Sequence, residues 1–203
     1  MRARDIMTRS LVTTGPFTLA KEAAVLLVDN GFTTLPVVDA DGRLVGVVTE
    51  ADILADRIAV DPRSLVHSDW PVHPASAPAP TVGAVMTTDV IARGPNADAA
   101  ELAHVMLERH LRAIPIVDGD RLVGIATRRD LLRTIARDDA AIVKDVRHHL
   151  ERCFNRGDWA ATVQDGVVTL IDEFGDEPER HIATVVAGAV PGVVDVRVMA
   201  PNR

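Results

Sequence analysis

The chain has 203 residues, of which 47% are hydrophobic and 25% are charged, and its formal net charge at pH 7 is −7. This length predicts one or two domains, and the ordinary composition excludes a disordered or collagen-like chain. The excess of negative charge disfavours nucleic acid and anionic lipid as partners, because both are themselves anionic.

The single cysteine, Cys153, excludes an intramolecular disulfide and any CxxC zinc or redox motif. The longest apolar run, AAVLLV at residues 23–28, is too short for a membrane span or a secretory signal. No histidines stand in HxxxH spacing with a third ligand, so we assign no metal. We expect a cytoplasmic protein.

Two segments of the chain repeat one another. RDIMTRSLVTTGP at residues 4–16 aligns with GAVMTTDVIARGP at 83–95, and residues 33–54 align with 112–132. The only gap is one residue, where the turn DADGR shortens to DGDR. A gap in a turn leaves the flanking elements intact, so the chain contains two copies of one structural unit.

The first copy, repeat 1 (residues 1–60), predicts the element order β-α-β-β-α. A strand at 11–14 leads through Gly15-Pro16 into a helix. The apolar residues of this helix stand at helical spacing, namely Leu19, Ala23, Leu26 and Leu27. Strands at 35–38 and 44–48 flank Asp41-Gly42, which is typical of a hairpin turn, and a last helix begins near Thr49.

Residues 61–80 contain five prolines and predict an extended linker, because proline breaks helices and central strands. His67 and His73 flank Trp70 there, and a metal-binding or docking role is the alternative to a plain spacer. Repeat 2 (81–137) has the order of repeat 1, with Leu102, Val105 and Met106 on one helix face. Neither repeat can bury a sheet alone, so we expect an α+β fold with the two packed as a pseudo-two-fold pair.

The carboxy-terminal module (138–203) predicts the order α-β-β-α-β. Its first helix, at 139–154, has apolar residues at helical spacing that we expect in the core: Ile142, Val143, Val146, Leu150 and Cys153. Strands at 159–164 and 167–173 flank Asp165-Gly166, a strong hairpin signal. In the helix at 177–189 we expect the face of Ile182, Val185, Val186 and Ala189 to be core, and a strand at 193–199 follows.

The paired repeats, with Met-Thr at the start, Pro-Val-Val or Pro-Ile-Val strands and a Gly-x-x-Thr-x-x-Asp motif, resemble a tandem cystathionine-beta-synthase (CBS) domain pair. The motif copies are GVVTEAD (46–52) and GIATRRD (124–130), and the resemblance covers residues 1–137. The carboxy-terminal module, with VQDGVVTL and VPGVVDV, is similar to a BON domain, a small module that binds phospholipid or partner proteins. It departs from that family at Asp172, where a glycine is usual.

The CBS resemblance implies a regulatory module, with no catalysis, that binds an AMP, ADP or ATP type of ligand in clefts between the repeats. In this family the threonine of the motif contacts phosphate, the aspartate binds the ribose hydroxyls, and the base lies against the first two strands. Carried over by position, the first site has Val12, Thr13, Leu35, Pro36, Thr49 and Asp52. The second site has Ile91, Ala92, Ile114, Pro115, Thr127 and Asp130. Apart from the resemblance, Arg128 and Arg129 are candidates for phosphate contacts, and so is Arg112, for which an exposed arginine on a strand is the alternative.

The spacing Thr-x-x-Asp also fits a capping box, in which both side chains only satisfy backbone groups at a helix start. Arg128 and Arg129 would lie in the first turn of a helix, where the helix dipole disfavours cations unless an anion binds there. We therefore predict that the second site prefers phosphorylated nucleotides. Glu50 repels phosphate, so the first site should be weak, empty or selective for a less negative ligand. Arginines in contact with solvent alone remain the alternative.

The carboxy-terminal module has 7 basic and 12 acidic residues, which disfavours binding to anionic membranes. The leading hypothesis is a cytoplasmic sensor in which an adenine nucleotide binds the CBS pair and the BON-like domain contacts a protein partner. The CBS resemblance also implies a homodimer through exposed helices. The alternatives are a constitutive scaffold with an unliganded pair, or membrane-surface association through the BON-like domain. An enzyme is disfavoured because no Gly-x-Ser-x-Gly motif or Walker loop is present.

Overall fold

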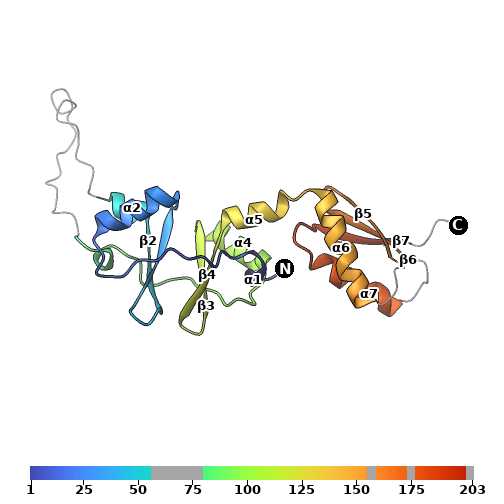
Figure 1. The fold of residues 1–203 in the computed structure, drawn as a ribbon, viewed down its shortest axis with the longest axis horizontal. Coiled ribbons are helices and arrows are strands. Elements are labelled where there is room, and N and C mark those ends of the chain that lie inside the picture. The colour runs from blue at the N-terminus through green and yellow to red at the C-terminus, as the bar shows by residue number, and fades with distance from the viewer. Residues whose placement is uncertain (56–79, 155–158, 173–176, 200–203) are drawn as a thin grey trace, which may run out of the picture. The chain divides into compact units, whose positions relative to one another are not determined.

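The computed structural model describes residues 1–55, 80–154, 159–172 and 177–199, which are drawn in colour in Figure 1. The chain divides into two compact units. Unit 1 contains residues 1–7, 96–110 and 126–203, and unit 2 contains residues 8–95 and 111–125. The predicted linker at 61–80, with Trp70 and its two histidines, lies outside the described residues except for Pro80.

Unit 2 is built from two β-hairpins and the helices of repeat 1. Its elements are α2 (Ala20–Asn30), β1 (Thr34–Val38), β2 (Leu44–Thr49), α3 (Glu50–Leu54), the short helix η2 (Val82–Ala84), β3 (Ala113–Asp118) and most of β4 (Arg121–Thr127). β1 pairs antiparallel with β2, and β3 pairs with β4. α2 ends at Gly31, whose φ of 62° is the left-handed conformation that glycine adopts without strain.

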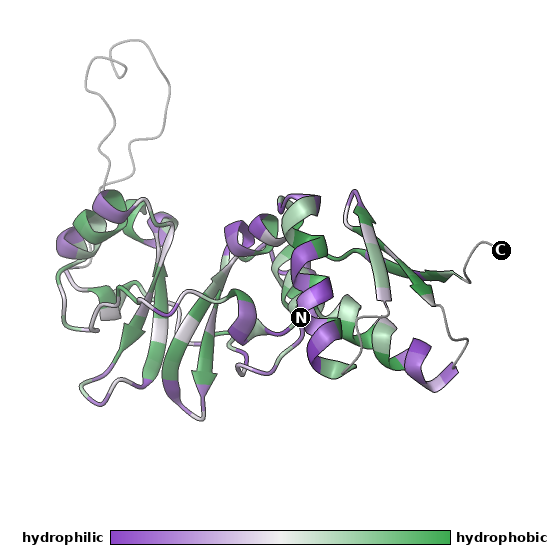
Figure 2. Ribbon diagram, turned by 45° about the vertical axis from the view of Figure 1, so that its right-hand side comes forward, coloured by the Kyte–Doolittle hydropathy of each residue, from purple (hydrophilic) through white to green (hydrophobic). Residues whose placement is uncertain are grey.

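The core of unit 2 lies between the first hairpin and the helices. Its buried residues are Ala20, Ala23, Leu27, Leu35, Val37, Val48, Ile53 and Val82. Figure 2 shows the strands mostly green (hydrophobic), with purple (hydrophilic) segments at the hairpin turns. The hairpin predicted for residues 35–48 is confirmed, with three consecutive buried residues in β1 and alternating burial in β2. In α2, Ala23 and Leu27 of the predicted face are buried, whereas Leu19 precedes the helix and is half exposed.

The strand predicted at 11–14 is wrong in extent. It is reduced to a single parallel bridge between Thr14 and Val37, and the corresponding segment of repeat 2 makes one bridge between Arg93 and Ile116. Thr14 bonds to β1 through both its N–H and its carbonyl, whereas residues 11–13 make no such backbone bonds within the described part of the chain.

The first residues of each repeat pack on the other repeat. In unit 2 the backbone N–H of Val82, from repeat 2, donates to the carbonyl of Thr18 in repeat 1 over 2.9 Å. In unit 1 the N–H of Ala3, from repeat 1, donates to the carbonyl of Ala97 in repeat 2 over 2.8 Å. This exchange explains why the two compact units do not follow the boundaries of the repeats.

Unit 1 combines helices of the repeats with the carboxy-terminal module. Its elements are α1 (Ala3–Ile6), α4 (Ala99–Glu108), α5 (Arg128–Ile135), α6 (Asp139–Cys153), β5 (Trp159–Gln164), β6 (Val167–Asp172), α7 (Glu177–Gly188) and β7 (Asp195–Met199). The sheet order is β5-β6-β7, antiparallel between β5 and β6 and parallel between β6 and β7. The elements follow in the predicted order.

The hairpin turn between β5 and β6 has the predicted residues in the predicted conformation. Asp165 and Gly166 both have positive φ, 50° and 74°, as a type I′ turn requires. The carboxylate of Asp139, in the first turn of α6, accepts from both of their N–H groups at 2.8 and 2.9 Å. The turn is therefore fixed to the start of α6.

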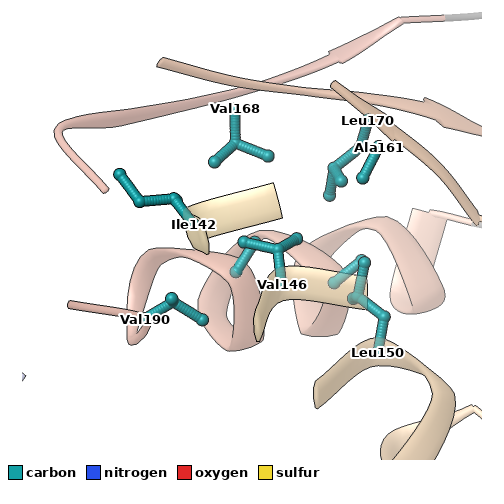
Figure 3. Packing of buried hydrophobic residues seen from close by; sticks show 9 residues of the cluster. Ile142, Val146, Leu150, Ala161, Val168, Leu170 and Val190 are labelled. Atoms are coloured by element: carbon teal, nitrogen blue, oxygen red, sulfur yellow. The ribbon is translucent and has the colours of Figure 1, made fainter. Parts of the chain in front are cut away.

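The core of the carboxy-terminal module lies between α6, α7 and the sheet. Its nine buried residues, drawn in Figure 3, are Ile142, Val146, Leu150, Ala161, Val168, Leu170, Ala183, Ala187 and Val190. Two predictions are wrong here. Cys153 is exposed, because it ends α6 beyond Leu150 and its neighbour Phe154 packs against the core instead.

The second error concerns the face of α7. Ile182 and Val185 are 47% and 58% exposed, whereas Ala183 and Ala187 are fully buried. α7 packs against both α6 and β7, and small side chains at the contact allow this close approach. The larger residues therefore remain on the outer face.

Candidate functional site

Both copies of the Thr-x-x-Asp motif form the predicted capping box at the junction of a strand and a helix. We call Thr49–Asp52 the first junction and Thr127–Asp130 the second junction. Oδ2 of Asp52 accepts from the backbone N–H of Thr49 at 2.8 Å and from its hydroxyl at 2.7 Å. The corresponding distances at the second junction are 2.9 and 2.6 Å. The motif therefore has a structural role at both places.

The two junctions differ in the second oxygen of the aspartate. Within the described ranges, Oδ1 of Asp52 has no protein partner. Oδ1 of Asp130 accepts from Arg133 at 3.1 Å, and Asp130 itself is buried. Because Arg133 is largely exposed to solvent, this ion pair is weak and a competing hydrogen-bond donor could replace it.

The first site is assembled within unit 2. The backbone N–H of Thr14 donates to the carbonyl of Pro36 at 3.1 Å, which places Val12 and Thr13 beside the buried Leu35-Pro36 segment of β1. Thr49 is the register partner of Thr34 on the same hairpin. All six residues predicted for this site lie in unit 2: Val12 and Thr13 are beside Leu35 and Pro36, and Thr49 and Asp52 follow at the end of the same hairpin.

Arg112, which we predicted for the second site, lies at the first junction. Its guanidinium forms an ion pair with Glu50, the residue directly after Thr49. This pair offsets part of the negative charge that Glu50 brings to the first site. The sequence could not indicate it, because the two residues are 62 positions apart.

The residues predicted for the second site are divided between the two units. In unit 2, the backbone N–H of Arg93 donates to the carbonyl of Pro115 at 3.1 Å. This bond places Ile91 and Ala92 next to the buried Ile114-Pro115 segment, as in repeat 1. Unit 1 contains the second junction with Arg128 and Arg129.

The two arginines of the second junction have different surroundings. A guanidinium nitrogen of Arg128 donates to the carbonyl of Met106 at 2.6 Å. Met106 lies in the last turn of α4, where carbonyl groups have no partner within the helix. Arg129 is exposed and makes no interaction within the described part of the chain. Arg128 thus stabilises the packing of α5 on α4, a role that the sequence analysis missed.

Within the described ranges, no three or more His, Cys, Asp or Glu side chains are grouped to hold a metal ion. Among the described helices, none combines the length and the apolar character needed to cross a bilayer. The chemistry that the junctions offer is hydrogen bonding by hydroxyl, carboxylate and backbone groups.

The model of the CBS domain family matches residues 3–57 and 82–137, and the chain belongs to this family. The match ends at residue 137. The chain is similar to the chloroplastic CBS domain-containing protein CBSX1 of Arabidopsis thaliana, with 35% identity over 132 residues, which is 58% of this chain and 56% of that protein. The part of this chain that matches covers only 32% to 56% of the length of three curated relatives, CBSX1 among them.

Two solved structures are similar to the CBS pair. The structure of CBSX2 in complex with AMP aligns with 65% of this chain, and the alignment includes 93% of the CBSX2 chain. The sequence identity is 30% and the TM-score is 0.53. The structure of the CBS domain pair of protein MJ0100, in complex with 5-methylthioadenosine and S-adenosyl-L-methionine, aligns with 66% of this chain and includes 94% of the MJ0100 chain. The sequence identity is 27% and the TM-score is 0.51. CBS-pair relatives thus bind AMP and S-adenosylmethionine-related ligands, and proteins with this pair are typically regulatory rather than catalytic.

Proposed function

We propose that this protein is a cytoplasmic regulatory sensor that binds adenosine ligands through its CBS pair. The observation that carries the proposal is the duplicated junction, with a threonine and an aspartate in the same geometry at the same place in each repeat. Relatives with this pair bind AMP, 5-methylthioadenosine or S-adenosylmethionine.

The charges around the junctions favour different ligands. The second junction has three arginines, Arg128, Arg129 and Arg133, around one aspartate. This excess of positive charge favours a phosphorylated nucleotide such as AMP. At the first junction Arg112 is paired with Glu50, and Oδ1 of Asp52, which has no partner among the described residues, can accept from a ribose hydroxyl. We therefore assign this junction an adenosyl ligand without phosphate, such as 5-methylthioadenosine.

Calorimetric titration of the full chain with AMP and with 5-methylthioadenosine tests this proposal. Arg129→Glu should weaken AMP binding by about fivefold, since one reversed charge near a phosphate contributes about 1 kcal/mol. Lys144→Glu, the same charge change on the exposed side of α6, is the matched control. Arg128→Glu is unsuitable, because it also breaks the bond to Met106.

Asp52→Asn tests the first junction separately. Asparagine keeps an oxygen that accepts from the backbone N–H of Thr49 but removes the charge, so 5-methylthioadenosine should bind more weakly while AMP binding is retained. Wild-type protein that gives no heat with either ligand at millimolar concentration would contradict the sensor and favour a constitutive scaffold.

The proposed output is a protein partner that contacts the carboxy-terminal module, to which we assign a BON-like character. The exposed apolar residues Ile182 and Val185 on α7 support a contact surface there. The acidic composition of the module favours a protein over an anionic membrane. A homodimer through the CBS helices completes the proposal.

A further inference from the structure

We propose that Arg137 locks the carboxy-terminal module to α5, so that the module follows any movement of this helix. This inference rests on the proposed function, because it supplies the route by which a ligand at the second junction would reach the module. All contacts that carry it lie within unit 1.

Arg137 lies between α5 and α6 and contacts two separate parts of the module. One guanidinium nitrogen donates to the carbonyl of Pro191 at 2.6 Å, and another donates to the carboxylate of Asp145 at 2.5 Å. Pro191 precedes β7, and Asp145 lies in α6. The planar guanidinium holds both acceptors at once in a fixed geometry, which an ammonium group cannot do.

The side chain of Arg137 is only 25% exposed, so the fork is partly shielded from solvent. The pKa of Asp145 is lowered, chiefly by the hydrogen bond from Arg137. The hydrogen bond therefore favours the ionised carboxylate, and a charged acceptor binds more strongly than a neutral one.

A close approach beside Arg137 also joins the module to α5. Gly192 has a φ of 94°, and a Cβ atom there would lie 3.0 Å from the carbonyl oxygen of Thr134 in α5. Only a residue without a side chain allows the turn before β7 to contact the last turn of α5 in this way.

These contacts place the second junction at one end of α5 and the attachment of the carboxy-terminal module at the other end. α5 begins at the second junction, directly after Thr127, and ends at Ile135, two residues before Arg137. A helix of this length moves as a rigid rod, so a ligand that displaces its first turn also displaces Arg137 and the turn at Pro191-Gly192. The module thereby reports the occupancy of the second junction.

Distance measurement by electron paramagnetic resonance tests the lock without a ligand. Cys153 is the only cysteine of the chain and is exposed on α6, and Ala100→Cys provides a second exposed label on α4. We expect one narrow distance distribution in this reference protein and a clearly broader one when Arg137→Gln is added. Arg147→Gln is the matched control, because Arg147 also donates to a carbonyl, that of Ala161, but entirely within the module.

If Arg137→Gln does not fold, Arg137→Lys replaces it, since lysine keeps the charge but loses the planar fork. A distribution as narrow as the reference in whichever variant folds would overturn the lock.

A second label pair, Cys153 with Lys21→Cys on α2, follows the response to AMP. We expect AMP to shift this distance in the reference and to leave it unshifted with Arg137→Gln, although both proteins bind AMP equally by calorimetry. Binding of AMP without a shift in the reference would refute the transmission. If AMP binds neither protein, the proposed function fails, while the label pair on α4 still decides whether the lock exists.

Discussion

Thr14 has a buried hydroxyl, Oγ1, with no hydrogen-bond partner within the described part of the chain. Both backbone groups of Thr14 are hydrogen-bonded: its N–H donates to the carbonyl of Pro36, and its carbonyl accepts from the N–H of Val38. A buried hydroxyl without a partner costs about 1–3 kcal/mol relative to one that is hydrated. The position therefore tolerates a polar residue at the expense of stability.

We predict that Thr14→Val stabilises the protein, because valine has nearly the same shape and no group that requires a hydrogen bond. The free energy of unfolding should rise by about 1 kcal/mol, which corresponds to a rise of about 3 °C in the melting temperature. Differential scanning calorimetry measures this. Thr88→Val, in an exposed loop, should leave the midpoint unchanged, and a lower midpoint for Thr14→Val would show that the hydroxyl is stabilising.

At this scale the sequence predicted roles that depend on neighbours along the chain and missed those that depend on distant ones. The capping boxes at Thr49 and Thr127 follow from spacing alone, and both are confirmed. The partners of Arg112 and Arg128 are 62 and 22 residues away, and no local pattern encodes such pairs. Helical spacing also predicts Cys153 in the core, which is wrong because spacing does not show that the buried face of α6 stops at Leu150.

Among the secondary-structure elements, the hairpin of β5 and β6 depends most clearly on one residue. Gly166 has a φ of 74°, and a Cβ atom there would lie 2.8 Å from the carbonyl oxygen of Gly192. Any other residue would meet both the strain of the left-handed conformation and a clash with the backbone of the turn before β7.

Gly166→Ala should therefore destabilise the carboxy-terminal module by at least about 1–2 kcal/mol. Gly188→Ala is the matched control, because its nearest neighbour would lie 3.8 Å away and its φ is not positive. This change should be neutral or stabilising by up to about 1 kcal/mol, since glycine disfavours a helix. Urea denaturation followed by tryptophan fluorescence distinguishes the two variants, with Trp70→Phe in both so that the signal comes from Trp159 at the start of β5. Equal midpoints would contradict the assigned turn.

The elements themselves were predictable wherever the pattern was long or duplicated. Helical spacing predicted α2, α4, α6 and α7, and turn residues predicted the hairpins. The face of α7 was not predictable, because alanines and valines both count as apolar and only packing against α6 and β7 selects the smaller ones. The length of the first strand of each repeat was not predictable, because the same short apolar pattern fits both a full strand and a single bridge.

For the whole molecule, the exchange of amino-terminal segments has a structural consequence. Val82 of repeat 2 is part of the buried core around repeat 1, and Ala3 of repeat 1 is fully buried in unit 1 with residues of repeat 2. Removing either repeat would leave such a core incomplete. This supports the expectation from the sequence that neither repeat folds alone.

The exposed apolar residues on the CBS helices bear on the oligomeric state. α2 and α3 pack against each other in unit 2 and leave Val25, Val28 and Leu54 exposed. In unit 1 the helices α4 and α5 expose Leu107, Leu132 and Ile135 in the same way. Apolar groups that recur on corresponding helices of both repeats are typical of surfaces that contact another protein, and they support the proposed homodimer.

We predict that the protein is a homodimer in solution and that Val28→Glu combined with Leu132→Glu makes it monomeric. Each charge would be buried without a partner at the interface, which costs several kcal/mol per site. Sedimentation velocity should give about twice the chain mass of 21.8 kDa for the wild type and the chain mass for the double variant. Val194→Glu, an equally exposed apolar residue of the carboxy-terminal module, should remain dimeric. A monomeric wild type, or a double variant that still dimerises, would show that these faces are not the dimer interface.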